Sequence, residues 1–330
     1  MIPRRTRVGL SLVAATTALV LTACSGGGAP EPAPAGSAGA GGGGNSGYTF
    51  AMVTHETPGD TFWDKIKAGA QQAATDTGST LKYSNDPDPA KQSTLIQNAV
   101  DSKVDGIATT LATPDALKGA VQSAKAANIP VVAFNSGIDQ YKDVGALMYF
   151  GSDETLAGQT AGQRIAAAGA KHPLCVIQAA GSVALEARCA GVKNGVAGTE
   201  NLQVNGADDS SVVSSLQAKL SEDKSIDYVV TLGAPIALDA IKAIDQSSSS
   251  AKLITFDLNA EAAQDIKDGK IQFSIDQQPY VQGYLAITSL YLNKKNGNDI
   301  GGGKPTLTGP SFVDSSNIDV ILPFTKNNTR

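Results

Sequence analysis

The sequence has few of the side chains that enzymes and metal sites most often use. Its 330 residues include three cysteines, two histidines and one tryptophan, and only 5% of them are aromatic. Neither His55 nor His172 is part of a His-Glu-x-x-His zinc motif, and no nucleophile elbow is present. The pair Gly303-Lys304 is followed by Pro305, so it is not a Walker loop. These absences argue against an enzyme, and an exported hydrolase or lyase is kept only as an alternative.

A surplus of positive charge is also missing. The chain has 26 Lys and Arg against 31 Asp and Glu, a net charge of −5, whereas nucleic-acid binding depends on an excess of basic side chains. Beyond the N-terminus, no stretch approaches the ~20 apolar residues that are needed to span a bilayer. A chain of this length with 42% hydrophobic residues is too long for one ordinary core. It predicts two lobes of roughly 100–150 residues each and no nucleic-acid partner.

The N-terminus has the pattern of an export signal. Three arginines within the first seven residues precede an apolar run over residues 8–20, which is too short for a membrane span. The run leads to Leu-Thr-Ala-Cys at residues 21–24, which resembles the bacterial lipobox. This resemblance implies a signal peptide over residues 1–23 and lipidation of Cys24, which would anchor the protein on the extracytoplasmic face of the cell membrane. An ordinary cleaved signal with an incidental cysteine is the alternative.

Residues 24–47 predict a flexible linker. They consist largely of Gly, Ala, Pro and Ser, which cannot bury a core. No strand precedes the glycine run at residues 41–44, so this run is not interpreted as a phosphate-binding loop. We expect the linker to hold a folded body roughly 25 Å from the membrane on average.

From residue 48 onward, strand and helix patterns alternate. Strands are predicted over residues 48–54, 81–84, 106–110, 130–135, 174–178, 228–232, 253–256 and 271–275. Helices are predicted over residues 61–77, 90–102, 114–127, 154–168, 184–196, 212–220, 235–245, 261–267 and 280–292. This order predicts an α/β fold of two Rossmann-like lobes, with parallel sheets flanked by helices. Ligands of such sheets bind beyond the carboxyl ends of the strands.

Two adjacent aromatic residues follow the first predicted strand, in a chain with few aromatics. Phe62 and Trp63 stand at the turn into the first helix, close to His55 and Asp60. A sugar or polyol presents an apolar C–H face to such rings and hydroxyl groups to polar side chains. We therefore predict that these four residues bind a small sugar or polyol, with His55 as a hydrogen-bond donor. The alternatives are one ring in the core, and His55 as a lone acid or base.

Polar side chains also follow other predicted strands. Asn135 stands at the end of one predicted strand, Asp257 directly after another and Gln277 two residues after a third. Arg188 lies on a helix that follows a strand. A buried Arg requires hydrogen-bond acceptors, which ligand hydroxyls can supply. Taken singly, each residue could be a helix cap or a surface group. Their shared placement favours a binding site, in which we also include Asp209.

Residues 48–330 resemble the ribose- and galactose-type periplasmic binding proteins, the solute receptors of sugar ABC importers. The matching segments are residues 62–71 (FWDKIKAGAQ), 104–107 (VDGI), 128–132 (NIPVV), 188–191 (RCAG), 254–257 (ITFD) and 275–279 (IDQQP). The resemblance implies the type I periplasmic binding protein fold, with two lobes joined by a three-segment hinge that closes on ligand. The implied N-terminal lobe is residues 48–151 plus 278–307, and the implied C-terminal lobe is residues 152–277 plus 308–330. It further implies a monomer without cofactor or metal, which delivers its ligand to ABC permease and ATPase subunits.

The sequence departs from the ribose-type pattern at four positions. Asn135-Ser136 stands where ribose-type members have Asp-Arg, Gly233 stands where they have Asn, and His55 has no counterpart in them. These changes remove hydroxyl contacts, so ribose itself is in doubt. We expect a pentose, pentitol or tetritol. A nucleoside-binding lipoprotein of the same fold is the alternative, and it would need stacking on both faces of a base.

The two cysteines beyond Cys24 are Cys175 and Cys189. One lies on a predicted strand and the other on the helix that packs over it, so a disulfide is feasible in an oxidising compartment. Two buried thiols are the alternative.

Overall fold

The computed structural model describes residues 45–330, in which strands and helices alternate almost throughout. The predicted signal peptide over residues 1–23, the lipidation site Cys24 and the linker as far as residue 44 lie outside the described residues. No helix within the described part of the chain is both long and apolar enough to cross a membrane.

The strands form two six-stranded sheets. The first has the order β11-β5-β4-β3-β1-β2, and all of its strands are parallel. Its strands are β1 (Thr49–Thr54), β2 (Thr80–Asn85), β3 (Gly106–Thr110), β4 (Val131–Phe134), β5 (Met148–Ser152) and β11 (Thr306–Gly309). The second has the order β12-β10-β9-β8-β6-β7, with only β12 antiparallel. Its strands are β6 (Pro173–Ile177), β7 (Glu200–Gln203), β8 (Tyr228–Thr231), β9 (Lys252–Phe256), β10 (Ile271–Asp276) and β12 (Ser311–Asp314).

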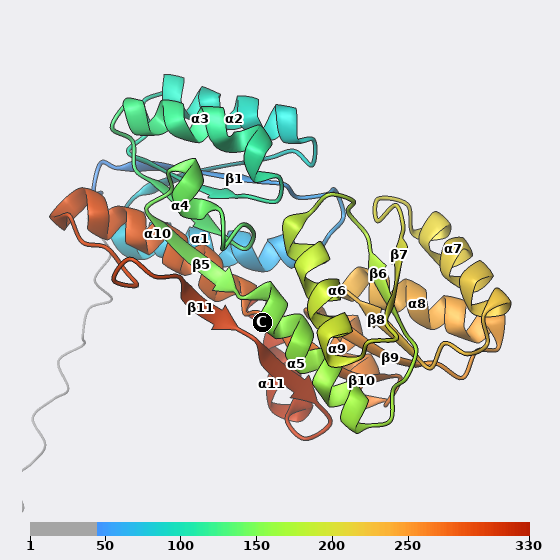
Figure 1. Ribbon diagram of the computed structural model, residues 1–330. Helices are drawn as coiled ribbons and strands as arrows, with labels where there is room; N and C mark the ends of the chain where they lie inside the picture. The colour runs from blue at the N-terminus through green and yellow to red at the C-terminus, as the bar shows by residue number, and fades with distance from the viewer. Residues whose placement is uncertain (1–44) are drawn as a thin grey trace, which may run out of the picture. The chain divides into compact units, whose positions relative to one another are not determined.

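Helices cover both faces of each sheet (Figure 1). We call the first sheet and its helices the N-terminal lobe, and the second sheet and its helices the C-terminal lobe. The N-terminal lobe contains α1 (Phe62–Thr77), α2 (Pro89–Asp101), α3 (Pro114–Ala126), α4 (Tyr141–Val144) and α10 (Pro279–Asn296). The C-terminal lobe contains α5 (Glu154–Ala167), α6 (Val183–Gly195), α7 (Asp209–Glu222), α8 (Ala234–Ser247), α9 (Ala260–Lys267) and α11 (Ile318–Thr325). The predicted α/β fold of two Rossmann-like lobes is confirmed.

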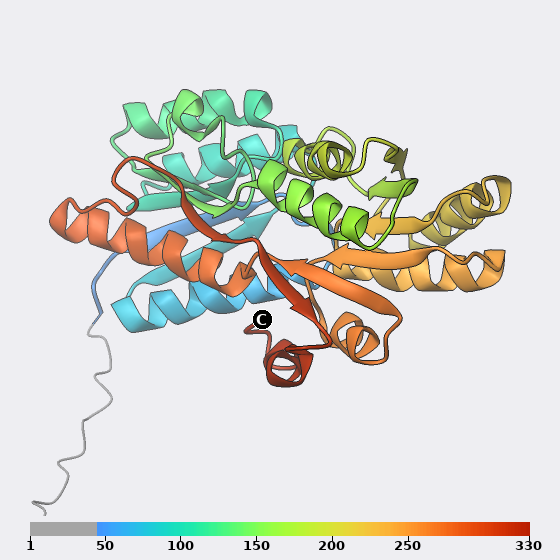
Figure 2. The same cartoon turned by 60° about the horizontal axis from the view of Figure 1, so that its bottom comes forward.

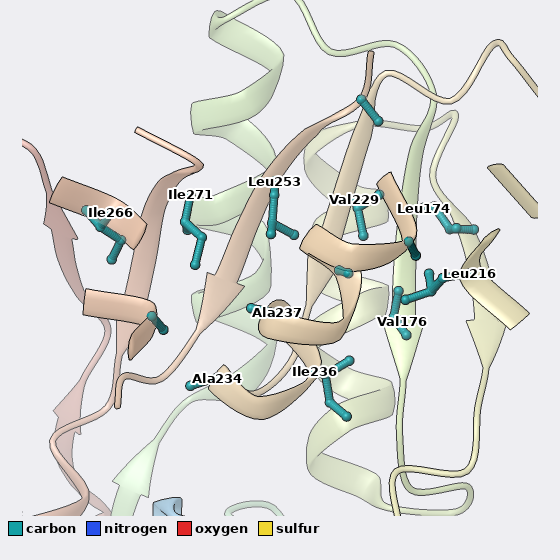
Figure 3. Packing of buried hydrophobic residues seen from close by; sticks show 14 of the residues in the cluster. Leu174, Val176, Leu216, Val229, Ala234, Ile236, Ala237, Leu253, Ile266 and Ile271 are labelled. Carbon is teal, nitrogen blue, oxygen red and sulfur yellow. The ribbon is translucent and has the colours of Figure 1, made fainter. Parts of the chain in front are cut away.

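The buried runs of the strands explain why both faces are covered. In the C-terminal lobe, Leu174, Val229 and Leu253 project from adjacent strands toward α8, where Ala237 and Ile236 pack against them (Figure 3). The burial of each such aliphatic side chain contributes about 1.5–3 kcal/mol. Because the opposite faces of these strands are buried as well, the strands read as continuous apolar runs in the sequence.

In each lobe one pair of helices packs backbone against backbone through glycine. A Cβ at Gly69 of α1 would lie 2.0 Å from the carbonyl oxygen of Tyr280 on α10. In the C-terminal lobe, a Cβ at Gly158 of α5 would lie 2.0 Å from the carbonyl oxygen of Arg188 on α6. No side chain fits at these distances, so the glycines bring α1 to α10 and α5 to α6.

The chain passes between the two sheets three times: after β5, after β10, and between β11 and β12. In Figure 2 the red segment of β11 and β12 runs from one sheet to the other. The three crossing segments touch at Gly309, where a Cβ would lie 2.9 Å from Asp276 O, Gln277 Cα and Ser152 Oγ. The residue numbers at which the lobes divide stay a prediction.

Several elements were not predicted from the sequence, and many predicted boundaries differ from the structure by one to four residues; two of these differences bear on the site. The unpredicted elements are α4, β5, β7, β11, β12 and α11. Helix α7 begins at Asp209 and not at residue 212, because the Asp208 carboxylate accepts a hydrogen bond from Ser211 N and caps the helix there. Strand β6 ends at Ile177, so Gln178 lies after the strand and not within it.

Cys175 of β6 and Cys189 of α6 form a disulfide with a Cα–Cα distance of 5.8 Å. Both residues are fully buried, and the bond ties α6 to the strand that it covers.

Candidate ligand-binding site

A cavity of about 680 Å³ opens at the carboxyl ends of strands from both sheets. Residues of both lobes line it, and they include all nine predicted binding residues: His55, Asp60, Phe62, Trp63, Asn135, Arg188, Asp209, Asp257 and Gln277. The first residues after β1, β4, β9 and β10 meet here because parallel strands end at one edge of a sheet. The structure thus brings the nine residues together, and their contact with ligand is a proposal.

Aromatic rings from the N-terminal lobe form one wall of the cavity. The Trp63 ring packs edge-on against Phe62, with centroids 5.2 Å apart and an interplanar angle of 85°. It packs in the same manner against the imidazole of His55, at 4.9 Å and 80°. Phe62 and Trp63 also contact the apolar core between α1 and the sheet. Both rings therefore line the cavity while the core holds them in place.

The hydrogen bonds around His55 assign its tautomer. Thr110 Oγ1 accepts hydrogen bonds from His55 N at 3.2 Å and from Gln92 Nε2 at 3.1 Å. Its own proton is then free to be donated to His55 Nδ1, 2.7 Å away. Burial lowers the pKa of His55 to about 4, so the ring is neutral at pH 7. His55 accordingly carries its proton on Nε2, where it can be donated to a ligand.

Arg188 is a buried cation with several partners. Its side chain is 3% exposed, and its Nε and Nη2 donate to Glu154 at 2.5 and 3.1 Å. Nη1 donates to Leu232 O at 3.1 Å and lies 3.6 Å from Asp257 Oδ2. A guanidinium has five N–H groups, and three of them are used by these bonds. Two remain for the cavity.

Asn135 and Asp257 occupy equivalent places in the two lobes, directly after β4 and β9. Both have left-handed backbone conformations, with φ of 65° and 63°, which are uncommon for residues other than glycine. Their N–H groups donate to Phe150 O and Ile275 O, each at 2.9 Å. Strained residues of this kind gather at functional sites.

A chain of hydrogen bonds joins the two lobes beneath the cavity. Asn135 Nδ2 donates to Gln277 Oε1 at 3.3 Å, and Gln277 Nε2 donates to Asp257 Oδ1 at 2.9 Å. Burial raises the pKa of Asp257 to about 7, although the nearby Arg188 guanidinium opposes this rise. A second hydrogen bond between the lobes runs from Val183 N of α6 to Ala112 O after β3, at 3.1 Å.

The other charged groups near the cavity are mainly acidic. Asp60 Oδ1 accepts a hydrogen bond from Phe62 N at 3.0 Å, and burial raises the pKa of Asp60. Lys65 of α1 is 1% exposed, and its Nζ donates to Thr61 O at 3.2 Å. Burial lowers the pKa of Lys65, and nearby carboxylates including Asp257 oppose this shift. Asp209 lies at the exposed rim.

Several polar residues of the cavity, among them Thr57, Ser182 and Asp208, are absent from the predicted set. Two further residues that sequence reasoning missed, Glu154 and Gln178, bear directly on the chemistry of the site. Glu154 does not line the cavity, and no sequence pattern marks it, since its role follows only from contact with Arg188. Gln178 lines the cavity and was overlooked because the predicted strand ran one residue too far. A strand boundary at residue 177 would have included Gln178 among the residues at strand ends.

Within residues 45–330, the one group of three His, Cys, Asp or Glu side chains that could hold a metal is His172, Glu200 and Asp223. None of them lines the cavity. The cavity itself offers hydroxyl-binding groups: carboxylates, amides, a guanidinium and an imidazole N–H.

Known proteins resemble the chain over most of its length. A family model described as a periplasmic binding protein domain matches residues 50–298. The xylose/arabinose-binding protein of Sulfolobus acidocaldarius is 28% identical over 272 residues, which is 76% of this chain. The match spans 65% of that relative's own length, slightly less than two thirds. The ribose import binding protein of Bacillus subtilis is 27% identical, and the match covers 84% of this chain and 90% of that protein.

Solved structures of transport proteins are also similar to the chain over most of its length. A carbohydrate transporter from Acidothermus cellulolyticus, determined in complex with myo-inositol, is 55% identical with a TM-score of 0.85. The match covers 86% of this chain and 99% of that one. A solute-binding protein of an ABC transporter from Burkholderia graminis, in complex with D-arabinose, has a TM-score of 0.75 at 22% identity, over 82% of this chain and 96% of that one. At this lower identity the likeness shows the fold alone.

Proposed function

The chain belongs to the periplasmic binding protein domain family, and from this premise we propose that it captures a cyclic polyol, myo-inositol or a close relative, for an ABC importer. The observation that carries the proposal is the shared cavity, in which an aromatic wall meets carboxylate, amide and guanidinium groups. The 55% identical transporter with bound myo-inositol supports the choice of ligand. The proposed ligand is thus a six-membered carbocycle, whereas the sequence suggested a pentose, pentitol or tetritol.

The chemistry of the cavity suits a neutral ring with many hydroxyls. Each hydroxyl both donates and accepts, so it can pair with Asp257 or with the two remaining N–H groups of Arg188. The His55 Nε2–H adds a neutral donor. The apolar face of the ring packs on the wall that contains Trp63. Because His55 is neutral and Arg188 is paired with Glu154, an anionic ligand would meet no free cation among these residues.

A pentose is the second candidate, since one curated relative is named for xylose and arabinose. The nucleoside alternative has less support. A base requires stacking on both faces, and none of the described cavity residues of the C-terminal lobe is aromatic. The expectation that the chain is not an enzyme is confirmed by the family, whose matched relatives are named as binding and transport proteins.

The family places this protein outside the cytoplasm, and we further propose a lipid anchor at Cys24. The apolar run and the lipobox-like residues 21–24 support it. Mass spectrometry of the N-terminal peptide would detect the acyl chains, and an unmodified Cys24 in protein from the native host would exclude the anchor. We expect the anchored monomer to deliver its ligand to ABC permease and ATPase subunits.

A panel of ligands tests the proposed function. Thermal melting is measured with myo-inositol, scyllo-inositol, D-arabinose, D-ribose, xylitol, erythritol and adenosine, followed by calorimetry for each hit. With every ligand at the same concentration, we expect the inositols to stabilise the protein most. Where that concentration is one hundred times the Kd, the stabilisation is about 2.7 kcal/mol. Stabilisation by adenosine or by the pentoses alone would contradict the inositol proposal.

A further inference from the structure

Gln178 is a polar cavity residue whose side-chain oxygen has no hydrogen-bond partner among the described residues. It follows β6 directly and lines the cavity from the C-terminal lobe. Its Oε1 is buried and has no hydrogen-bond partner among residues 45–330. Buried polar atoms in folded proteins are nearly always paired, so an unpaired one requires an explanation.

Two glycines form the space that holds this side chain. A Cβ at Gly206 would lie 2.7 Å from Gln178 Cβ and 3.1 Å from its Cγ. A Cβ at Gly233 would lie 3.2 Å from Gln178 Nε2. The main chain is held as well, because Gly206 N donates to Gln178 O at 3.0 Å. The stem of Gln178 is therefore fixed, and its amide ends beside Gly233.

The Gln178 amide occupies the space next to residue 233. Its nitrogen approaches the place that the first side-chain atom at residue 233 would take. An amide on the side chain of residue 233 would therefore reach the same part of the cavity from the residue that precedes α8.

We propose that Gln178 is a specificity-determining residue whose amide binds two neighbouring hydroxyls of the ligand. A primary amide presents a donor and an acceptor side by side, and a vicinal diol presents the complementary pair. The terminal torsion of glutamine is soft, so the amide can turn to bring Oε1 to a hydroxyl that enters the cavity. This inference rests on the proposed function, because it takes the ligand to be a cyclic polyol.

The test compares Gln178→Ala with wild type in calorimetry, using myo-inositol and a set of its monodeoxy analogues. We expect Gln178→Ala to bind myo-inositol about tenfold more weakly. One or two deoxy analogues lack a hydroxyl that Gln178 binds. For these analogues we expect Gln178→Ala to have a Kd only about twofold larger than that of wild type. Gln163→Ala, which changes an exposed glutamine of α5, is the matched control and should bind as wild type does.

A double substitution separates the amide from the shape of the cavity. In the double variant Gln178→Ala with Gly233→Asn, the side chain of residue 233 supplies the amide. The affinity for myo-inositol should then recover to within about threefold of that of wild type. Gly233→Asn alone should weaken binding, because its Cβ meets the Gln178 amide at 3.2 Å.

Two outcomes would overturn the inference: Gln178→Ala binding myo-inositol within about twofold of wild type, or an equal loss for every deoxy analogue. If wild type binds no inositol, the proposed ligand is wrong. The same comparison is then made with the polyol or sugar from the panel that does bind and with its deoxy analogues, and it decides the role of Gln178 separately.

Discussion

Asn135 and Asp257 hold equivalent places in the two lobes and share a left-handed backbone, yet only one of them can ionise. Asp257 is 4% exposed and contacts Gln277 and Arg188. The loss of hydration on burial outweighs the attraction of the guanidinium, so the pKa of Asp257 rises to about 7. At the residue scale, the charge of the site therefore depends on pH in the neutral range.

We expect ligand affinity to increase as the pH rises through 7. A ligand hydroxyl donates more strongly to a carboxylate than to a neutral acid, so binding favours ionised Asp257. With a pKa of about 7 in the free protein, the Kd at pH 6 should be about tenfold larger than at pH 8. Calorimetry across this range measures the change. In Asp257→Asn the Kd should be larger and nearly independent of pH, and a wild-type Kd that does not vary with pH would contradict the assignment.

The same pKa has the opposite effect on folding. The folded protein keeps the Asp257 proton up to about pH 7, whereas the unfolded chain loses it near 3.8. The contribution of Asp257 to stability is thus present below pH 3.8 and is lost as the pH rises to about 7. His55, with its pKa lowered to about 4, contributes stability that is lost as the pH falls below 6.5. Comparison with Asp257→Asn isolates the first effect in denaturant titrations.

Replacement of Arg188 should lower the stability of the folded protein. Arg188→Met would leave the buried Glu154 carboxylate, 3% exposed, without its cation. We expect the free energy of unfolding to fall by about 3–5 kcal/mol, as measured by urea denaturation. Arg188→Met combined with Glu154→Leu should lose less stability than Arg188→Met alone, because the Glu154 carboxylate is no longer left without a cation. If the double variant were less stable than Arg188→Met, the unpaired Glu154 carboxylate would not be the cause of the lost stability.

At the scale of elements, glycine contacts position the site. Gly158 of α5 lets the Arg188 backbone approach, which brings Glu154 at the start of α5 to the guanidinium on α6. The disulfide at Cys189, the next residue of α6, holds the same helix against β6. The contact between α1 and α10 is of the same kind and lies behind Phe62 and Trp63. Close helix pairs thus support both walls of the cavity.

Gly158→Ala should separate α5 from α6. The new methyl group would lie 2.0 Å from a backbone oxygen, which cannot move as a side-chain end can. We expect a loss of at least about 2 kcal/mol in the free energy of unfolding, together with weaker ligand binding through displaced Arg188. Gly119→Ala in α3 is the control, since nothing beyond the neighbouring backbone of its own helix lies within 4 Å of its Cβ position. That control should gain about 0.5–1 kcal/mol from higher helix propensity.

At the scale of the whole molecule, we expect the two lobes to move relative to each other when the ligand is captured. The three crossing segments meet at Gly309, and the hydrogen-bond chain through Gln277 passes close to them. A ligand that contacts both lobes favours the arrangement in which they are close together. The cavity is lined from both lobes, so we expect closure about these segments.

Small-angle X-ray scattering measures this closure. The radius of gyration of residues 45–330 should decrease on saturation with the ligand identified in the panel. Arg188→Met, if it remains folded, should show a smaller decrease because one lobe has lost its main donor. An unchanged radius of gyration in wild type at saturation would contradict closure in solution.

The sequence determined the elements with long apolar runs and the residues that follow them. Periodicity located eight strands and nine helices, and the rule of strand ends selected His55, Asn135, Asp257 and Gln277, which the fold brings to one cavity. The short strands β7, β11 and β12 escaped prediction because, unlike the four-residue strands β4 and β8, they are not continuous buried apolar runs. Strand β5 is fully buried, and its run Met-Tyr-Phe-Gly-Ser shows no alternation.

Tertiary structure alone decided which polar groups face one another. Glu154 and Arg188 lie 34 positions apart in the chain, and no local pattern announces their contact. The amide of Gln178 reaches the cavity only because residues 206 and 233, far along the chain, are both glycine. Hydrophobic periodicity is a property of neighbouring residues, so helices and strands can be located from the sequence alone. Hydrogen-bond partners and close approaches depend on contacts between distant segments, which exist only after the sheets and helices have packed.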